Sequence, residues 1–258
     1  MKSKFTRRTL IALFAVSALV LSACSSGSSD KKAGGDVKVS LITKDQTNPF
    51  FVAMIKGAKD KAASLGVDLT IASGKQEGDD ASQIAAIENA ISAKHAGILI
   101  TPMSVNVNDA IKKARAAGLF VIALDTPTDP ADIVDITFAT NNCEAGELIG
   151  KWAAAKLGGK KAVIALLDIF NDRMVSVDYC RDNGFLKGMG IDVKNPKIMG
   201  DEAKTGKYSG GDYVIVGNKA TGANEAGGRT GLEQLLAKNK AINVVYTINE
   251  PKIGRAHV

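Results

Sequence analysis

The stretch VKVSLITKDQTNPFFVAMIKGAKDKAASLG, residues 37–66, holds the pattern that decides the fold of this 258-residue chain. Residues 37–42 form a short, mostly apolar segment of strand type, and residues 49–65 place apolar side chains at helical spacing. Pro49 suits the first turn of a helix, and Gly66 suits its end. A strand followed by a helix is the repeating unit of a parallel sheet, so we expect an α/β fold.

The same unit recurs along the chain, and the series restarts after residues 139–142. Two series predict two doubly wound parallel-sheet lobes joined by hinge strands, one spanning residues 37–140 and the other residues 141–251. Residues 208–217 contain Gly210 and Gly211 in a β-rich stretch and predict a hairpin. The further strands are predicted at 67–72, 97–100, 119–124, 133–139, 161–167 and 243–248, and the further helices at 79–93, 106–117, 143–157, 175–189 and 224–238.

The N-terminal end has the pattern of an export signal. Residues 1–8 carry four cations, and the apolar run that follows, 10–20, is too short to span a bilayer. Leu21-Ser22-Ala23-Cys24 resembles the lipobox of bacterial lipoproteins, which implies a lipid on the thiol of Cys24. The alternative is a plain secretory signal with an incidental cysteine. We therefore expect a signal peptide at 1–23, a flexible Ser/Gly-rich tether at 24–36, and a lipid-anchored protein on the extracytoplasmic face of the membrane.

The charge balance argues against a nucleic-acid partner. The chain has a formal net charge of +6, but four of its cations lie in residues 1–23 and two in residues 252–258. Residues 24–251 hold 27 Lys and Arg against 27 Asp and Glu. The aromatic content of 5% is also low for a surface that stacks bases. We expect no nucleic-acid binding.

Two cysteines besides Cys24 lie in the second lobe, at Cys143 and Cys180. An exported protein could pair them. The sequence does not show that their Cα atoms come close enough for a bond. Two free, partly buried thiols are the expectation, and a disulfide is the alternative.

Polar and aromatic residues follow the predicted strands at the edge where parallel sheets bind ligands. Carboxylate, amide and guanidinium groups can bracket hydroxyls, and an aromatic ring can cover the C–H face of a sugar. This combination predicts a site for a polyhydroxylated ligand, although each residue alone could be an ordinary cap or turn residue. The candidate ligand-binding residues are Asn48, Phe50, Phe51, Asp125, Asn142, Arg173, Arg181 and Asn249.

The same positions carry a family resemblance over essentially residues 37–251. The segments TNPFF at 47–51, VIALD at 121–125, RDNGF at 181–185 and TINE at 247–250, with Asn142, resemble the sugar-binding proteins of bacterial ABC importers, of the ribose-binding type. The resemblance implies a type I periplasmic binding protein fold, a monosaccharide ligand, an ABC transporter permease as partner, a monomer and no cofactor. Residues 201–208 and 246–251 look most like a branch associated with fructose uptake.

Two departures from the family pattern leave the sugar open. Ribose binders usually have arginine directly after the aspartate, where this chain has Thr126. The arginine expected in the second lobe could correspond to Arg173 or to Arg181.

Other functional classes have less support from the sequence. Only His95 and His257 are present, no Cys/His spacing suits a metal, and we expect neither an enzyme nor a metal site. His95 is expected at a helix end or facing solvent. A sugar-responsive repressor would need a DNA-binding domain where residues 1–35 form the export segment and tether. A receptor coupled to a membrane sensor kinase is the alternative function.

The last seven residues, KIGRAHV at 252–258, break the βα pattern. They are what the start of a common sequencing adapter encodes. We expect this tail to be non-native and the C-terminal part of the second lobe to be missing from the chain.

Overall fold

A computed structural model describes residues 37–253. The predicted signal peptide at 1–23, the lipidated Cys24, the tether at 24–36 and residues 254–258 of the tail lie outside the described residues. Between residues 37 and 253, no helix combines the length and the apolar character that crossing a membrane requires.

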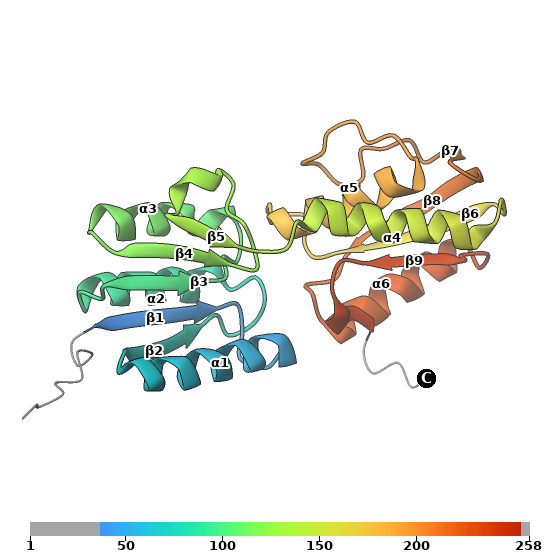
Figure 1. The fold of residues 1–258 in the computed structure, drawn as a ribbon. Coiled ribbons are helices and arrows are strands. Elements are labelled where there is room, and N and C mark those ends of the chain that lie inside the picture. The colour runs from blue at the N-terminus through green and yellow to red at the C-terminus, as the bar shows by residue number, and fades with distance from the viewer. Residues whose placement is uncertain (1–36, 254–258) are drawn as a thin grey trace, which may run out of the picture. The chain divides into compact units, whose positions relative to one another are not determined.

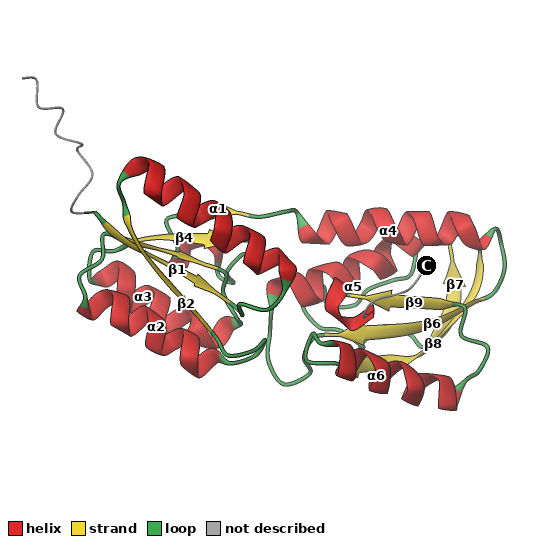
Figure 2. Cartoon of the chain, turned by 90° about the horizontal axis from the view of Figure 1, so that it is seen from below, coloured by secondary structure: helices red, strands yellow, loops and turns green. Residues whose placement is uncertain are grey.

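The first lobe is a five-stranded parallel sheet with helices on both faces (Figure 1). The strand order is β2-β1-β3-β4-β5, which brings the ends of β1, β3 and β4 side by side. Helix α1 covers one face, and α2 and α3 cover the other (Figure 2). The elements are β1 Lys38–Thr43, α1 Pro49–Leu65, β2 Asp68–Ser73, α2 Asp80–Ser92, β3 Gly97–Ile100, η1 Val105–Val107, α3 Asn108–Ala116, β4 Phe120–Leu124, η2 Ala131–Ile133 and β5 Ile136–Phe138.

The second lobe has a four-stranded sheet in the order β7-β8-β6-β9. Strands β8, β6 and β9 are parallel, while β7 and β8 form the predicted antiparallel hairpin. Helices α4 and α5 lie on one face and α6 on the other (Figure 2). The elements are α4 Asn142–Leu157, β6 Ala162–Asp168, α5 Ser176–Met189, β7 Thr205–Tyr208, β8 Gly211–Ala220, α6 Glu225–Lys238, β9 Val244–Thr247 and η3 Glu250–Ile253. The predicted two-lobed α/β fold is confirmed.

The helix ends follow local side-chain chemistry. Four helices begin after an Asn or Asp whose side chain accepts a backbone N–H of the first turn, and such caps satisfy donors that have no intrahelical partner. Three helices end at a glycine in the left-handed conformation. The capping residues are Asn48, Asp79, Asn141 and Asn224, and the terminal glycines are Gly66, Gly158 and Gly190.

Each lobe has its own apolar core. Ile42, Ile98 and Val121 on three neighbouring strands are fully or almost fully buried in the first lobe. In the second lobe Phe185 of α5 is buried beside Leu166 and stacks on Tyr246 of β9, with ring centroids 4.1 Å apart. Phe185 packs α5 against the strands, and this packing fixes the position of the whole helix relative to the sheet.

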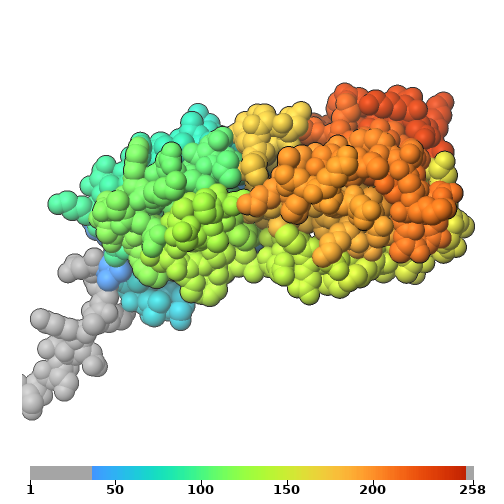
Figure 3. Space-filling model, turned by 90° about the horizontal axis from the view of Figure 1, so that it is seen from above, coloured from blue at the N-terminus to red at the C-terminus, as the bar shows by residue number. Residues whose placement is uncertain are grey.

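Helices α4 and α5 approach each other through glycine. A Cβ atom on Gly150 would lie 2.1 Å from the carbonyl oxygen of Phe185, and one on Gly188 would lie 2.1 Å from that of Glu147. No side chain larger than hydrogen fits at such distances. The opposite side of α4 lies at the molecular surface (yellow-green in Figure 3), where Leu148 and Trp152 are exposed.

The close approach also joins the two cysteines of the second lobe. Cys143 in the first turn of α4 and Cys180 of α5 form a disulfide. The expectation of two free thiols was wrong. The sequence separation of 37 residues carries no information about distance, whereas the glycines on both helices permit backbones to come within disulfide range.

The close packing predicts that glycine-to-alanine substitutions in α4 and in α1 have opposite effects on stability. Gly150→Ala should destabilise the protein by about 1–3 kcal/mol, because the methyl group must push α4 away from α5. Gly57→Ala is the matched control, since a Cβ there meets nothing within 4 Å in the middle of α1. It should stabilise the protein by about 0.5–1 kcal/mol. Thermal unfolding measures the stability change of each variant. Equal stability changes for Gly150→Ala and Gly57→Ala would contradict the close packing of α4 on α5.

Candidate functional site

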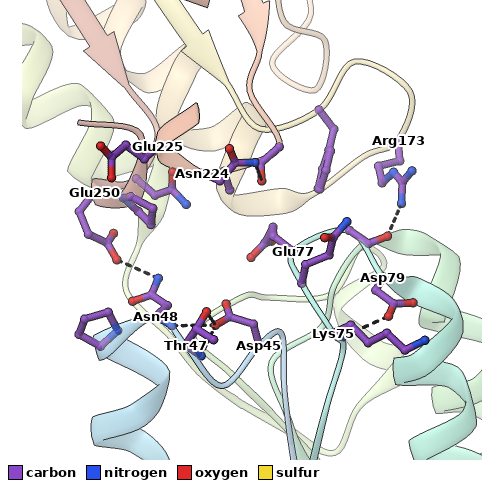
Figure 4. Close-up of a pocket in the computed structure, with 18 residues that line it drawn as sticks. Asp45, Thr47, Asn48, Lys75, Glu77, Asp79, Arg173, Asn224, Glu225 and Glu250 are labelled. Carbon is purple, nitrogen blue, oxygen red and sulfur yellow. Dashed lines mark hydrogen bonds between the residues drawn. The ribbon is translucent and has the colours of Figure 1, made fainter. Parts of the chain in front are cut away.

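The ends of the strands in both lobes border a cavity of about 110 Å³. It is lined by six of the eight predicted ligand-binding residues, namely Asn48, Phe50, Phe51, Asp125, Arg181 and Asn249. A larger cavity of about 1180 Å³, drawn in Figure 4, shares Asn48, Glu77, Asn249 and Glu250 with it. Because they share these residues, the two cavities adjoin. Asn142 lines neither cavity, and Arg173 lines only the larger one.

The two adjacent phenylalanines at the start of α1 have different surroundings. Phe51 is 4% exposed and belongs to the core, whereas Phe50 is 48% exposed. Their rings meet edge to face, with centroids 5.2 Å apart. As expected for neighbours about 100° apart on a helix, only one packs inward. Phe50 therefore offers an accessible ring at the cavity.

Asn48 holds the start of α1 and reaches toward the second lobe. Its Oδ1 accepts the N–H of Phe50 at 2.9 Å, and its Nδ2 donates to Oε1 of Glu250 at 3.0 Å (Figure 4). The loop before it is ordered by Asp45, whose Oδ1 accepts the N–H groups of Thr47 and Asn48, each at 2.7 Å. Asn48 thus caps the helix, as the simpler interpretation of the sequence suggested, and also lines the cavity.

Asp125 directly follows β4 in the left-handed conformation, with φ of 61°. Aspartate is one of the few residues other than glycine that adopt this conformation readily. Its N–H donates to the carbonyl oxygen of Phe138 at 2.9 Å, and its Oδ2 accepts the hydroxyl of Thr126 at 2.9 Å. Thr126, which stands where ribose binders usually have arginine, therefore orients the Asp125 carboxylate.

Arg181 is anchored to two segments of the second lobe. Its Nε donates to Oδ1 of Asn142 at 2.8 Å, and its Nη1 donates to the carbonyl oxygen of Ile248 at 3.0 Å. Asn142 is 5% exposed, and its Nδ2 donates to the carbonyl oxygen of Thr140 at 3.1 Å. Both polar ends of the Asn142 side chain are thus engaged within the protein, and this residue supports Arg181 from behind.

Arg173 has a different set of partners. Its guanidinium contacts Oδ2 of Asp80 at 2.9 Å, both carboxylate oxygens of Asp172, and the carbonyl oxygen of Gly78 at 2.8 Å. These acidic neighbours raise the pKa of Arg173, with the hydrogen bond to Asp172 as the largest cause. Of the two candidate arginines, Arg181 is the one that shares the smaller cavity with Asp125.

Asn249 follows β9 and lines both cavities. Its Oδ1 is buried and has no hydrogen-bond partner among the described residues. A buried acceptor without a donor is costly, and a ligand hydroxyl at this position would remove the cost. This is the clearest unsatisfied polar atom at the cavity.

Sequence reasoning missed an ion pair in the cavity wall. Lys44 at the end of β1 lies 3.0 Å from Oε1 of Glu77, and both side chains are nearly buried. The signal that could have found Glu77 is its place after β2, because the carboxyl ends of all five parallel strands lie at one edge. The prediction covered only the residues after the other strands of this sheet.

His95 lies outside the residues that line either cavity. It is buried, and its Nδ1 lies 2.8 Å from the hydroxyl of Ser40 in β1. The expectation was a position at a helix end or facing solvent. His95 does lie at the C-terminal end of α2, where its N–H donates to the carbonyl oxygen of Ala90, but it does not face solvent, because the chain turns inward to begin β3. Within residues 37–253, no group of three or more His, Cys, Asp or Glu side chains is arranged to hold a metal ion.

A cluster of carboxyl groups is buried at the end of β6. Asp178 of α5 accepts the N–H groups of Ile169 and Phe170 at 2.9–3.0 Å, which orders the turn after the strand. Burial, followed by the charge of Asp178, raises the pKa of Asp168 to about 7. Burial also raises the pKa of Asp182 well above its usual range, and the charge of Asp168 adds to this shift.

The described part of the predicted non-native tail contacts the end of β6 next to this cluster. Lys252 is buried in η3, and its Nζ donates to the carbonyl oxygen of Leu167 at 2.6 Å. Burial lowers the pKa of Lys252 to about 8, although Asp178 and Asp168 oppose the shift. The non-native origin of residues 252–258 stays a prediction.

Residues 39–256 match the periplasmic binding protein domain family. The chain belongs to this family. Among curated members, the D-apiose import binding protein of Actinobacillus succinogenes is 26% identical over 216 residues, which is 74% of this chain and 66% of that protein. The ribose import binding protein of Salmonella typhimurium is 30% identical over 155 residues, 60% of this chain and 50% of that protein.

Solved structures of periplasmic binding proteins share the fold. A sugar transporter from Clostridium phytofermentans superposes with a TM-score of 0.69 at 24% identity, covering 84% of this chain and 72% of that one. A solute-binding protein from Burkholderia graminis in complex with D-arabinose gives a TM-score of 0.68 at 23% identity, covering 85% of this chain and 68% of that one.

A third curated relative, the D-allose-binding periplasmic protein of Escherichia coli, is 29% identical over 135 residues, 50% of this chain and 43% of that protein. The chain thus spans between about two fifths and two thirds of the length of these three curated relatives.

The buried carboxyl group of Asp168 should make stability depend on pH. Its pKa is about 7 in the folded protein and 3.8 when unperturbed, so between these values the folded state keeps a proton that the unfolded state loses. The stability contribution is full below about pH 4 and is lost as pH rises through 7, by up to about 4 kcal/mol. Asp168→Asn should therefore gain stability over the wild type as pH rises from 5 to 8, measured by urea unfolding.

The matched control for this test is Asp109→Asn, which removes an exposed carboxylate in α3. Its difference from the wild type should stay nearly constant between pH 5 and pH 8. A constant difference for Asp168→Asn as well would contradict the raised pKa.

Proposed function

We propose that this chain is the extracytoplasmic binding component of an ABC importer and captures a monosaccharide, fructose or a ribose-like sugar, for delivery to the permease. The observation that carries the proposal is the grouping of Phe50, Asp125, Arg181 and Asn249 around one cavity. The ring can cover the C–H face of a sugar, and the polar groups match its hydroxyls. Names of relatives support the class of ligand: D-allose, D-apiose and ribose.

The charges at the cavity favour a neutral ligand. Lys44 and Arg181 face Asp125, Glu77 and Glu250, so carboxylates outnumber cations among the lining residues. Lys44 is already paired with Glu77. Among the residues that line the smaller cavity, Arg181 is the cation left for a phosphate or carboxylate ligand, and Asp125 would repel such a ligand. A neutral sugar suits this balance better than a sugar phosphate or a sugar acid.

The proposal includes the cellular arrangement expected from the sequence. A lipid on Cys24 would keep a monomeric receptor near its permease, with residues 24–36 as the tether. The role is binding and release without catalysis and without a cofactor. Sugar binding would favour the form in which both lobes contact the ligand, because a ligand shifts an equilibrium only by its differential affinity.

A thermal-shift panel of pentoses and hexoses on the full-length protein tests the proposal. A sugar at about 100-fold above its Kd should stabilise the protein by about 2.7 kcal/mol. Fructose or ribose should give the largest shift, and their phosphate esters should give little. Asp125→Asn should remove the shift, since asparagine keeps the left-handed conformation but loses the charge that strengthens hydroxyl binding.

Asp132→Asn is the control for Asp125→Asn, because Asp132 is an exposed residue of the same lobe outside both cavities. It should leave the shift unchanged. Absence of any shift with every sugar tested would overturn the proposed function.

The two candidate arginines should differ in their effect on binding. Arg181→Ala should weaken sugar binding by about 10- to 100-fold, as expected for loss of a charged hydrogen-bond donor. Arg173→Ala should have a much smaller effect, because its guanidinium is paired with Asp80 and Asp172. Isothermal titration of both variants measures their sugar affinities. A larger loss of affinity for Arg173→Ala would indicate that the ligand binds in the larger cavity.

A further inference from the structure

The disulfide of the second lobe lies directly beside two residues of the candidate site. Cys143 follows Asn142 in α4, and Cys180 precedes Arg181 in α5. We propose that the Cys143–Cys180 disulfide is a positioning element for sugar binding, which holds the Arg181 guanidinium ready for the ligand. This inference rests on the proposed function of the cavity and adds to it a dependence on the oxidation state of the cysteines.

The disulfide joins the two backbones that carry the Arg181–Asn142 hydrogen bond. Nε of Arg181 reaches Oδ1 of Asn142 at 2.8 Å only while the first turn of α4 stays beside α5. Together with the bond from Nη1 to the carbonyl oxygen of Ile248, this fixes the plane of the guanidinium. Nη2 makes no hydrogen bond to any of residues 37–253, so both of its N–H groups are left for a ligand.

The rest of the helix pair does not need the disulfide to stay together. Gly150 and Gly188 let the backbones touch in the middle of the pair, and Phe185 anchors α5 in the core. Gly146 and Gly184 allow the same close approach beside Cys143. The cysteines lie at the end of the pair next to the cavity, where the disulfide fixes this approach covalently. The first turn of a helix lacks part of its intrahelical hydrogen bonding, so it depends more than the middle of the helix on contacts from outside. The link therefore acts chiefly on Asn142 and, through it, on Arg181.

Holding an arginine before the ligand arrives improves affinity. A free arginine side chain loses much rotamer freedom when a ligand fixes it, and that loss weakens binding. A guanidinium already fixed by Asn142 and Ile248 loses less. Opening the disulfide should free the Arg181 side chain, so that sugar binding again has to restrict it. We expect sugar affinity to become about 3- to 10-fold weaker.

The test is a double-mutant cycle on the full-length protein, with the affinities for fructose and for ribose measured by isothermal titration. One axis is Cys143→Ala/Cys180→Ala, and the other is Arg181→Lys, which keeps the charge but removes the planar donor fork. Loss of the disulfide should weaken binding about 3- to 10-fold when Arg181 is present and less than about 2-fold when lysine replaces it. Reduction of the wild type should reproduce the first effect, reoxidation should reverse it, and the alanine pair should not respond to reductant.

Each outcome separates a positioning role of the disulfide from a general effect on the second lobe. Equal affinity of the oxidised and reduced wild type would overturn the inference and leave the proposed function intact. An equal loss in the Arg181→Lys background would also overturn it, because the disulfide would then act on the lobe as a whole. If the oxidised wild type bound no sugar, the proposed function would fail first, and the role assigned to the disulfide would fail with it. Circular dichroism of the alanine pair verifies that the helices remain folded.

Discussion

Parallel pairing of the strands is the constraint on which the site depends. In a parallel ladder, all carboxyl ends leave the sheet at one edge, so residues far apart in sequence are brought together without any direct attraction between them. Asp125 after β4 and Phe50 after β1 line one cavity for this reason. The second sheet contributes Asn249 after β9 by the same rule. Each lobe supplies part of the cavity wall, and neither supplies all of it.

Much of this arrangement could be predicted from the sequence because it follows from local rules. The periodicity of 37–65 gives a strand and a helix, and the strand ends then identify Asn48, Asp125 and Asn249 as candidates. Rotation between neighbouring helical residues predicts that only one of Phe50 and Phe51 is buried. These inferences need no knowledge of distances between lobes.

What could not be predicted depends on close contacts between distant segments. Spacing did not distinguish Arg173 from Arg181, because the difference lies in their partners: Asp80 for one, Asn142 for the other. The disulfide was only the alternative to two free thiols, since nothing local shows that Gly150 and Gly188 allow two helices to touch. The place of Glu77 after β2 could have identified it as a candidate, but its ion pair with Lys44, which joins the ends of two neighbouring strands, could not be predicted.

Some polar groups of the cavity already have hydrogen-bond or ion-pair partners within the protein, and others are available to a ligand. Arg181 is held by Asn142, and Lys44 is paired with Glu77, so the cationic groups need little rearrangement. Asn249 Oδ1 has no partner among the described residues, and only one oxygen of Asp125 is engaged. Such a cavity mainly lacks hydrogen-bond donors, and donors without charge are what the hydroxyls of a neutral sugar supply. The proposed preference for a monosaccharide over an anion therefore rests on which hydrogen bonds the protein has already made.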